Sequence, residues 1–197
     1  AKIGGKDKEQ DLFRYVDENG NDFDIKAEHI NEYLNQKMKN KYTAKDFRTW
    51  AASWKTGARL AMVSEASEKE ISELPELHQE AVEKSEKDGF PPYVEWCGRY
   101  LKGTEGLAKL AESGNLPGET DKERMATMLA VIDTVAADLG NTRAVCRSSY
   151  IRPMFMEDWE ERVFLDRWNE AKKGQIRGEN MWPDETAAIN YMKEWEE

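Results

Sequence analysis

An apolar stripe with helical spacing, framed by a start and a stop signal, most constrains how this chain folds. Thr-Asp-Lys-Glu at residues 120–123 is a capping-box sequence, and Gly140 is a typical helix stop. Between these signals the large apolar side chains recur every three or four residues: Met125, Met128, Leu129, Ile132, Val135, Ala136 and Leu139. This pattern predicts a helix that buries one face in a core.

Most of the remaining chain also has helical periodicity. Residues 27–38 carry apolar side chains at helical spacing, and Thr-Ala-Lys-Asp at 43–46 resembles a second capping box. That box opens a helix whose predicted apolar face carries Phe47, Trp50, Ala51, Trp54 and Ala58. Residues 142–150 read as a short helix, ended by a proline at position 153.

The tail is predicted to form two amphipathic helices. Trp159, Val163, Trp168 and Ala171 mark the first, and Ala188, Tyr191 and Trp195 mark the second.

Strand signals are found only at the start, where segments 11–16 and 22–25 flank the turn sequence Asp-Glu-Asn-Gly at 17–20. Residues 64–118 read as an acidic helical stretch broken at Pro75, followed by short helices and loops rich in proline and glycine. We therefore expect a mainly α fold with a short N-terminal β-hairpin. The predicted parts are 1–63, an acidic insertion at 64–119, a segment at 120–153 and a helical tail at 154–197.

Composition excludes several classes of protein. Charged residues make up 35% of the chain and the mean hydropathy is −0.85, so no membrane span is expected. Cys97 and Cys146 are too few for a disulfide framework and are interpreted as free thiols in a reducing compartment. Neither His29 nor His78 has a second ligand at metal spacing, so we predict no metal site. With Ala1 first and no signal sequence, the chain resembles a piece of a longer protein.

The net charge of −10 argues at first against DNA binding, which requires Lys and Arg. The charges are unevenly distributed, however. Residues 26–59 hold eight Lys/Arg against three Asp/Glu, and residues 141–153 hold three arginines and no acid. These two segments are candidate DNA contacts, although a charge run is more often a solvated face.

The second basic segment also carries candidate chemistry. Asn141 lies near a helix N-terminus, and Tyr150 follows nine residues later, with Arg147 between them. Amide and guanidinium groups bind phosphate oxygens, and a phenol needs such surroundings to act as a nucleophile near neutral pH. Taken alone this signal is weak, because a tyrosine at a helix end is usually a packing residue.

Two longer strings resemble the signature of type IB DNA topoisomerases, in particular the bacterial branch related to the poxviral enzymes. Lys-Asp-Phe-Arg-Thr-Trp at 45–50 resembles the family segment with a catalytic arginine. Leu-Gly-Asn-Thr at 139–142, followed by Ala-Val-Cys-Arg and then Tyr150, resembles the segment with the nucleophile. The stretch from residue 12 to residue 34 resembles the segment that bacterial members place before the arginine.

The resemblance implies a multi-helix catalytic domain of the topoisomerase and tyrosine recombinase kind. It implies that Tyr150 attacks a DNA phosphate, that Arg48 and Asn141 stabilise the phosphate charge, and that Lys45 and Arg147 make supporting contacts. It implies double-stranded DNA as the partner, no ATP, metal or other cofactor, and a cytoplasmic, nucleoid location.

The family also uses a second arginine and a general-acid lysine, both before the Arg48 segment. Arg14 lies in the predicted hairpin, without suitable surroundings for that arginine. The Gly-Lys-Asp-Lys string around Lys6 resembles the poxviral hairpin that carries the acid, but bacterial members place that hairpin well before the Leu-Phe-x-Tyr segment, and here the two run together. We favour a solvated terminal lysine, with Lys6 as general acid the alternative. We therefore expect an N-terminal domain outside this chain to supply both groups, and the isolated chain to be inactive.

Two alternatives stay open. A tyrosine recombinase shares the fold and the Arg–Tyr chemistry, but it would carry His at the position of Lys45 and His or Trp at that of Asn141. A non-catalytic DNA-binding or interaction module could have kept the fold without the reaction.

Overall fold

The computed structural model describes residues 14–174, 176 and 180–196, and for 194–196 the backbone only. It divides into two units, and the division in the chain falls between Phe47 and Arg48. The predicted candidate Lys6 and the start of the predicted hairpin lie outside the described residues.

The first unit contains the predicted hairpin and one helix. Strands β1 (Arg14–Val16) and β2 (Asp22–Asp24) pair antiparallel with Tyr15 opposite Phe23, and these two rings stack with centroids 5.3 Å apart. The carboxylate of Asp17 accepts the backbone N–H groups of Asn19 and Asn21, which closes the turn. Helix α1 (Ala27–Met38) follows, so both elements predicted here are confirmed within the described residues.

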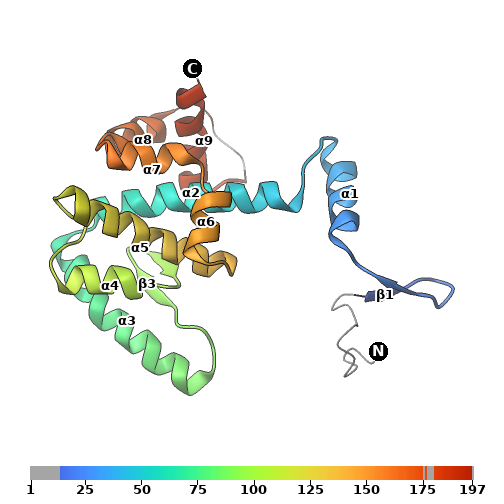
Figure 1. Ribbon diagram of the computed structural model, residues 1–197, viewed down its shortest axis with the longest axis horizontal. Coiled ribbons are helices and arrows are strands. Elements are labelled where there is room, and N and C mark those ends of the chain that lie inside the picture. Colours follow the sequence, from blue (N-terminus) through green and yellow to red (C-terminus); the bar gives the residue numbers. More distant parts are fainter. Residues whose placement is uncertain (1–13, 175, 177–179, 197) are drawn as a thin grey trace. The chain divides into compact units, whose positions relative to one another are not determined.

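The second unit is built around helix α2 (Ala44–Glu65), which belongs to this unit from Arg48 onward. The other elements follow in chain order: α3 (Glu68–Asp88), β3 (Val94–Trp96), β4 (Arg99–Leu101), α4 (Glu105–Glu112), α5 (Asp121–Leu139), α6 (Arg143–Ser149), α7 (Pro153–Glu160), α8 (Phe164–Lys173) and α9 (Pro183–Glu196). Figure 1 shows α7, α8 and α9 on one side of α2, and α3, α4 and α5 on the other. The unit is thus mainly helical, as predicted.

Helix α2 is buried on both sides because layers of helices pack against both. Its second half is enclosed all round, from Thr56 to Val63. Gly57 permits the closest approach: a Cβ built there would lie 2.7 Å from the Trp168 ring and 3.0 Å from that of Phe155. The predicted apolar face was therefore only partly right: Phe47 is exposed and Trp50 and Trp54 are half-buried, whereas Ala58 is buried as predicted.

Helix α5 confirms the predicted helix and its two end signals, but its buried surface is wider than the predicted stripe, since Thr127 and Val131 are also fully buried. Thr120 accepts the N–H of Glu123, the Glu123 carboxylate accepts that of Thr120, and Gly140 ends the helix at φ 65°. Met128, Ile132 and Val135 are fully buried.

Three local predictions were wrong. Helix α3 continues through Pro75, because a Ser67–Glu70 capping box starts it and the fully buried Leu74 anchors it to the core, which offsets the lost hydrogen bond. A second hairpin, β3–β4, lies inside the predicted insertion. Its two-residue turn places Cys97 and Gly98 at positive φ. Gly98 is typical of such a turn, but it was not recognised as a hairpin signal in the sequence.

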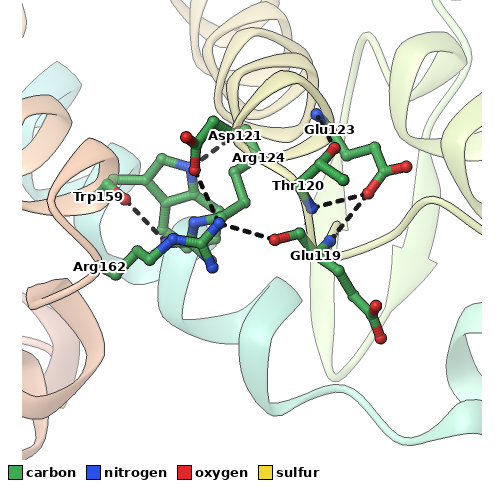
Figure 2. Close-up of polar contacts among 7 residues, drawn as sticks. All are labelled: Glu119, Thr120, Asp121, Glu123, Arg124, Trp159 and Arg162. Atoms are coloured by element: carbon green, nitrogen blue, oxygen red, sulfur yellow. Dashed lines mark hydrogen bonds and ion pairs between the residues drawn. The ribbon is translucent and has the colours of Figure 1, made fainter.

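The third error concerns the tail, where the first predicted helix is two helices. Trp159 lies on α7 and Trp168 on α8, and Arg162 separates them at φ 66°. Figure 2 shows what holds this corner: the Arg162 guanidinium donates to the Glu119 carbonyl and the Asp121 carboxylate, both at 2.7 Å. These tertiary contacts stabilise a backbone conformation that helical periodicity cannot reveal.

The same corner locks α7 against α5. The Trp159 indole N–H donates to the Arg124 carbonyl at 2.8 Å, and the Arg124 guanidinium donates to the Trp159 carbonyl at 2.8 Å (Figure 2). The guanidinium carbon also lies 4.1 Å from the centre of the indole ring. Helix α7 therefore has a fixed place relative to α5.

Among the described residues, no helix is long and apolar enough to cross a membrane.

Candidate active site

Three candidate residues come from separate elements of the second unit. Arg48 lies near the start of α2, Asn141 between α5 and α6, and Tyr150 directly after α6. Asn141 and Tyr150 lie at helix ends, where backbone hydrogen bonds hold the chain, whereas Arg48 lies within the second turn of α2.

The end of α5 fixes the backbone of Asn141. Gly140 adopts the left-handed conformation, and the Asn141 N–H donates to the Ala136 carbonyl at 2.9 Å, as in a Schellman cap. Thr142 then starts α6 by accepting the Val145 N–H with its hydroxyl at 3.3 Å. The Gly-Asn-Thr sequence thus stops one helix and starts the next, with the asparagine held between them.

The end of α6 fixes Tyr150. Its N–H donates to the Cys146 carbonyl at 3.1 Å, and the next residue, Ile151, donates to the same carbonyl at 3.2 Å. Ile151 is buried, whereas the side chain of Tyr150 is half-buried. Pro153 then opens α7, a position where a missing N–H costs nothing. The backbone that carries the tyrosine is therefore well anchored.

Arg48 connects the other two segments. Its Nη2 donates to the Leu139 carbonyl at 2.9 Å, two residues before Asn141. Its guanidinium carbon lies 5.2 Å from the centre of the Tyr150 ring, within the range of a cation–π contact. The structure thus brings the predicted arginine to the predicted tyrosine and to the segment of the predicted asparagine.

Two buried donors in this cluster have no acceptor among the described residues, Nε of Arg48 and Nδ2 of Asn141. Buried donors are paired in the large majority of cases, so each exception calls for an explanation. A guanidinium N–H and an amide N–H in one cluster fit an anionic oxygen acceptor such as a phosphate.

Cys146, on α6 four residues before Tyr150, is a poor candidate for the nucleophile. It is fully buried, and burial raises the pKa of its thiol, an effect that the nearby Arg48 only partly opposes. Because the thiolate is the reactive form, this cysteine is inert near neutral pH. Cys97 and Cys146 are both free, as predicted.

The remaining basic candidates differ in their surroundings. Arg147 and Arg152 are exposed on either side of Tyr150, whereas Arg143 is held by Asp133, with its Nε 2.6 Å from the carboxylate. Lys45 lies exposed in the first turn of α2 and belongs to the first unit, so its relation to Tyr150 stays a prediction.

Sequence reasoning missed Asp138, which fixes the end of α5 to α2. Its carboxylate accepts Lys55 and the buried Arg59, both at 2.6 Å, and Arg59 also donates to Thr134 at 3.0 Å. Burial raises the pKa of Asp138, but the charges and hydrogen bonds of Arg59 and Lys55 outweigh that and hold the pKa below its ordinary value. The one available signal was a charged pair at positions 55 and 59 inside an otherwise small and apolar stretch.

Comparison with known proteins assigns the chain to a family. The family model described as eukaryotic DNA topoisomerase I, catalytic core, matches residues 2–173, up to the end of α8. No curated protein and no solved structure matches the chain. Since the family model covers most of the 197 residues, the chain belongs to the DNA topoisomerase I catalytic-core family.

Proposed function

We propose that this chain is the catalytic part of a type IB topoisomerase that relaxes supercoiled DNA through a transient single-strand break at Tyr150. The family acts on DNA as a type I topoisomerase, and the type IB mechanism, its residues and the bacterial, nucleoid setting are our proposal. The match to a topoisomerase family favours this function over a recombinase.

One observation carries the proposal. Arg48 lies against the Tyr150 ring and bonds the segment that leads to Asn141, while Arg48 and Asn141 each keep a buried donor that finds no acceptor within the described part of the chain. A scissile phosphate beside the Tyr150 hydroxyl would supply the acceptors.

In the proposed reaction the Tyr150 Oη attacks the phosphorus, and the bond from phosphorus to the 5′ oxygen breaks. The protein is then joined to the 3′ end, and the 5′ oxygen leaves as a hydroxyl with a proton from a general acid. Arg48 and Asn141 hold the non-bridging oxygens, whose charge increases in the transition state. Lys45 and Arg147 add contacts to neighbouring phosphates, which position the DNA without reading its sequence.

The reaction exchanges one phosphoester for another, so we propose that it needs neither ATP nor a metal ion. Rotation of the DNA about the intact strand relaxes the supercoil, and attack by the 5′ hydroxyl restores the bond and frees Tyr150.

We also propose that the general acid and the second arginine belong to an N-terminal domain of the same protein. Arg14 pairs with Asp22 and Asp24 in the hairpin, which ties up its guanidinium at the surface. The 197-residue chain alone should therefore bind DNA but show little or no cleavage.

Relaxation of a negatively supercoiled plasmid by the full-length protein tests this function. We expect relaxation in EDTA without ATP, and none by the Tyr150→Phe variant. A strict requirement for Mg²⁺ or ATP would contradict the type IB mechanism. DNA binding by the full-length protein without relaxation would favour the non-catalytic module.

A further inference from the structure

A buried serine links the helix of Arg48 to the corner that carries Tyr150. The Ser53 hydroxyl donates to the Tyr150 carbonyl at 3.2 Å and accepts the Arg152 N–H at 3.1 Å. The serine is 1% exposed, so water does not compete for these bonds. The link thus holds the backbone on both sides of Ile151.

We propose that Ser53 is a positioning residue that sets the Tyr150 hydroxyl against the phosphate-binding group of Arg48. This inference rests on the proposed function. Ser53 does not touch the DNA in this account, and it acts only through the backbone of the nucleophile.

The need for such a link follows from the place of Tyr150 at a helix end. The last carbonyl groups of a helix receive no hydrogen bond from an N–H of the same helix. Tyr150 is the C-cap residue of α6. Its carbonyl finds a donor in Ser53, and the Arg152 N–H, which precedes α7, finds an acceptor there. One hydroxyl therefore satisfies both backbone groups of the turn between α6 and α7.

The same helix carries the other reacting group. Ser53 follows Arg48 by five residues on α2, a rise of about 7.5 Å along a rigid helix. Helix α2 therefore fixes the position of the Tyr150 backbone relative to Arg48. The guanidinium carbon of Arg48 lies 5.2 Å from the centre of the Tyr150 ring. Catalytic geometry tolerates little error, since a shift of about 1 Å can cost about 100-fold in rate.

A purely structural reading treats the Ser53 hydroxyl as a buried group that only stabilises the fold. That reading predicts a lower melting temperature after removal of the hydroxyl, with normal cleavage by the molecules that remain folded. Positioning predicts slower cleavage at unchanged DNA affinity. The two readings therefore separate in single-turnover kinetics.

Helix α2 offers matched controls for the loss of a hydroxyl. Ser64 donates to the Leu60 carbonyl of its own helix at 2.9 Å, and Thr56 donates to the Ala52 carbonyl at 2.8 Å. Neither bond reaches the tyrosine corner. Ser64→Ala repeats the chemical change of Ser53→Ala, and Thr56→Val repeats the loss of a fully buried hydroxyl.

The test measures single-turnover formation of the covalent adduct by full-length protein on a suicide substrate, an oligonucleotide duplex whose short cleaved end dissociates. We expect Ser53→Ala to slow adduct formation about 10- to 100-fold. Affinity for the same duplex, measured in the Tyr150→Phe background, should change less than about twofold. Ser53→Thr, which keeps the hydroxyl, should recover most of the rate, and both controls should cleave at the wild-type rate.

Each other outcome is decisive. A wild-type cleavage rate for folded Ser53→Ala overturns the positioning role and leaves the proposed function intact. An adduct formed by Tyr150→Phe overturns the proposed function itself. If Ser53→Ala does not fold, Ser53→Cys decides, because its thiol is a weak hydrogen-bond partner of similar size, and full-rate cleavage by that variant refutes the proposal.

Discussion

The guanidinium carbon of Arg48 lies 5.2 Å from the centre of the Tyr150 ring, although α2 and α6 are far apart in the sequence. The same guanidinium bonds the Leu139 carbonyl at the end of α5. One arginine thus contacts both segments that carry the other candidate groups. In the proposed site a phosphate meets Arg48 and Tyr150 together.

Arg48→Lys should slow cleavage about 100- to 1,000-fold, as expected for a lost transition-state donor. A lysine keeps the charge but lacks the planar fork, and it cannot bond Leu139 and a phosphate in the same way. Single-turnover adduct formation measures the effect. Arg162→Lys is a matched control, because that guanidinium contacts Glu119 and Asp121 instead. Equal losses in both variants would argue against a specific role for Arg48.

Asn141→Ala should slow cleavage by about 100-fold or more, because it removes the buried amide donor that has no acceptor in the structure. Asn141→His should keep more activity than Asn141→Ala, since a histidine can donate an N–H from nearly the same place. Adduct formation at saturating protein separates this loss from weaker DNA binding. A rate for Asn141→Ala close to that of wild type would exclude the asparagine from the reaction.

Asp138→Ala should destabilise the fold by about 3–5 kcal/mol, because it leaves the buried Arg59 without its partner. Urea unfolding of the full-length protein measures the change, provided that the catalytic domain unfolds in a separate transition. Asp121→Ala is the control: that carboxylate is 90% exposed, and its pairing with Arg162 should contribute less than about 1 kcal/mol. Similar losses for both would contradict the structural role of Asp138.

The stabilising effect of Asp138 should also depend on pH. Its pKa in the folded state lies below the ordinary value of 3.8, so the folded state binds a proton less readily than the unfolded chain. The stabilisation is therefore complete above that ordinary value and is lost as the pH falls through the lower folded pKa. The difference in unfolding free energy between wild type and Asp138→Asn should shrink from pH 5 to pH 3. A constant difference would show that the carboxylate charge is unimportant.

Gly57→Ala should destabilise the second unit by about 1–3 kcal/mol. The added Cβ would lie 2.7 Å from the Trp168 ring, which is held among other aromatic rings and cannot move freely. In an open helix position the same substitution stabilises by up to about 1 kcal/mol. A higher melting temperature for this variant would therefore contradict the close packing of α2 against α8.

The sequence predicted the elements whose signals are local. The capping box at Thr120 and the stop at Gly140 lie where they were expected, and the N-terminal hairpin is present over its described residues. The box predicted at Thr43 is half formed, because the Asp46 carboxylate accepts the Thr43 N–H while the Asp46 N–H donates to the Thr43 backbone carbonyl. The proximity of Arg48 and Tyr150 was also implied, through the family resemblance rather than through spacing.

Other features depend on contacts that no local pattern records. Helix α3 continues through Pro75 because the surrounding core holds it, and Arg162 divides the tail because Glu119 and Asp121 bind it. Ser53 gave no signal, and Asp138 gave only the indirect one of the charged pair at positions 55 and 59, because the partners of both lie far away in the chain. The buried side chains that fix the site are thus visible only in three dimensions.

Covalent trapping tests the central claim most directly. Full-length protein is incubated with a suicide duplex labelled on the cleaved strand, and the labelled adduct is digested and mapped by mass spectrometry. The account predicts a DNA 3′-phosphate joined to the Tyr150 oxygen in wild type and no adduct in Tyr150→Phe. An adduct at another residue, a link to the 5′ end, or no adduct with the wild-type protein would contradict it.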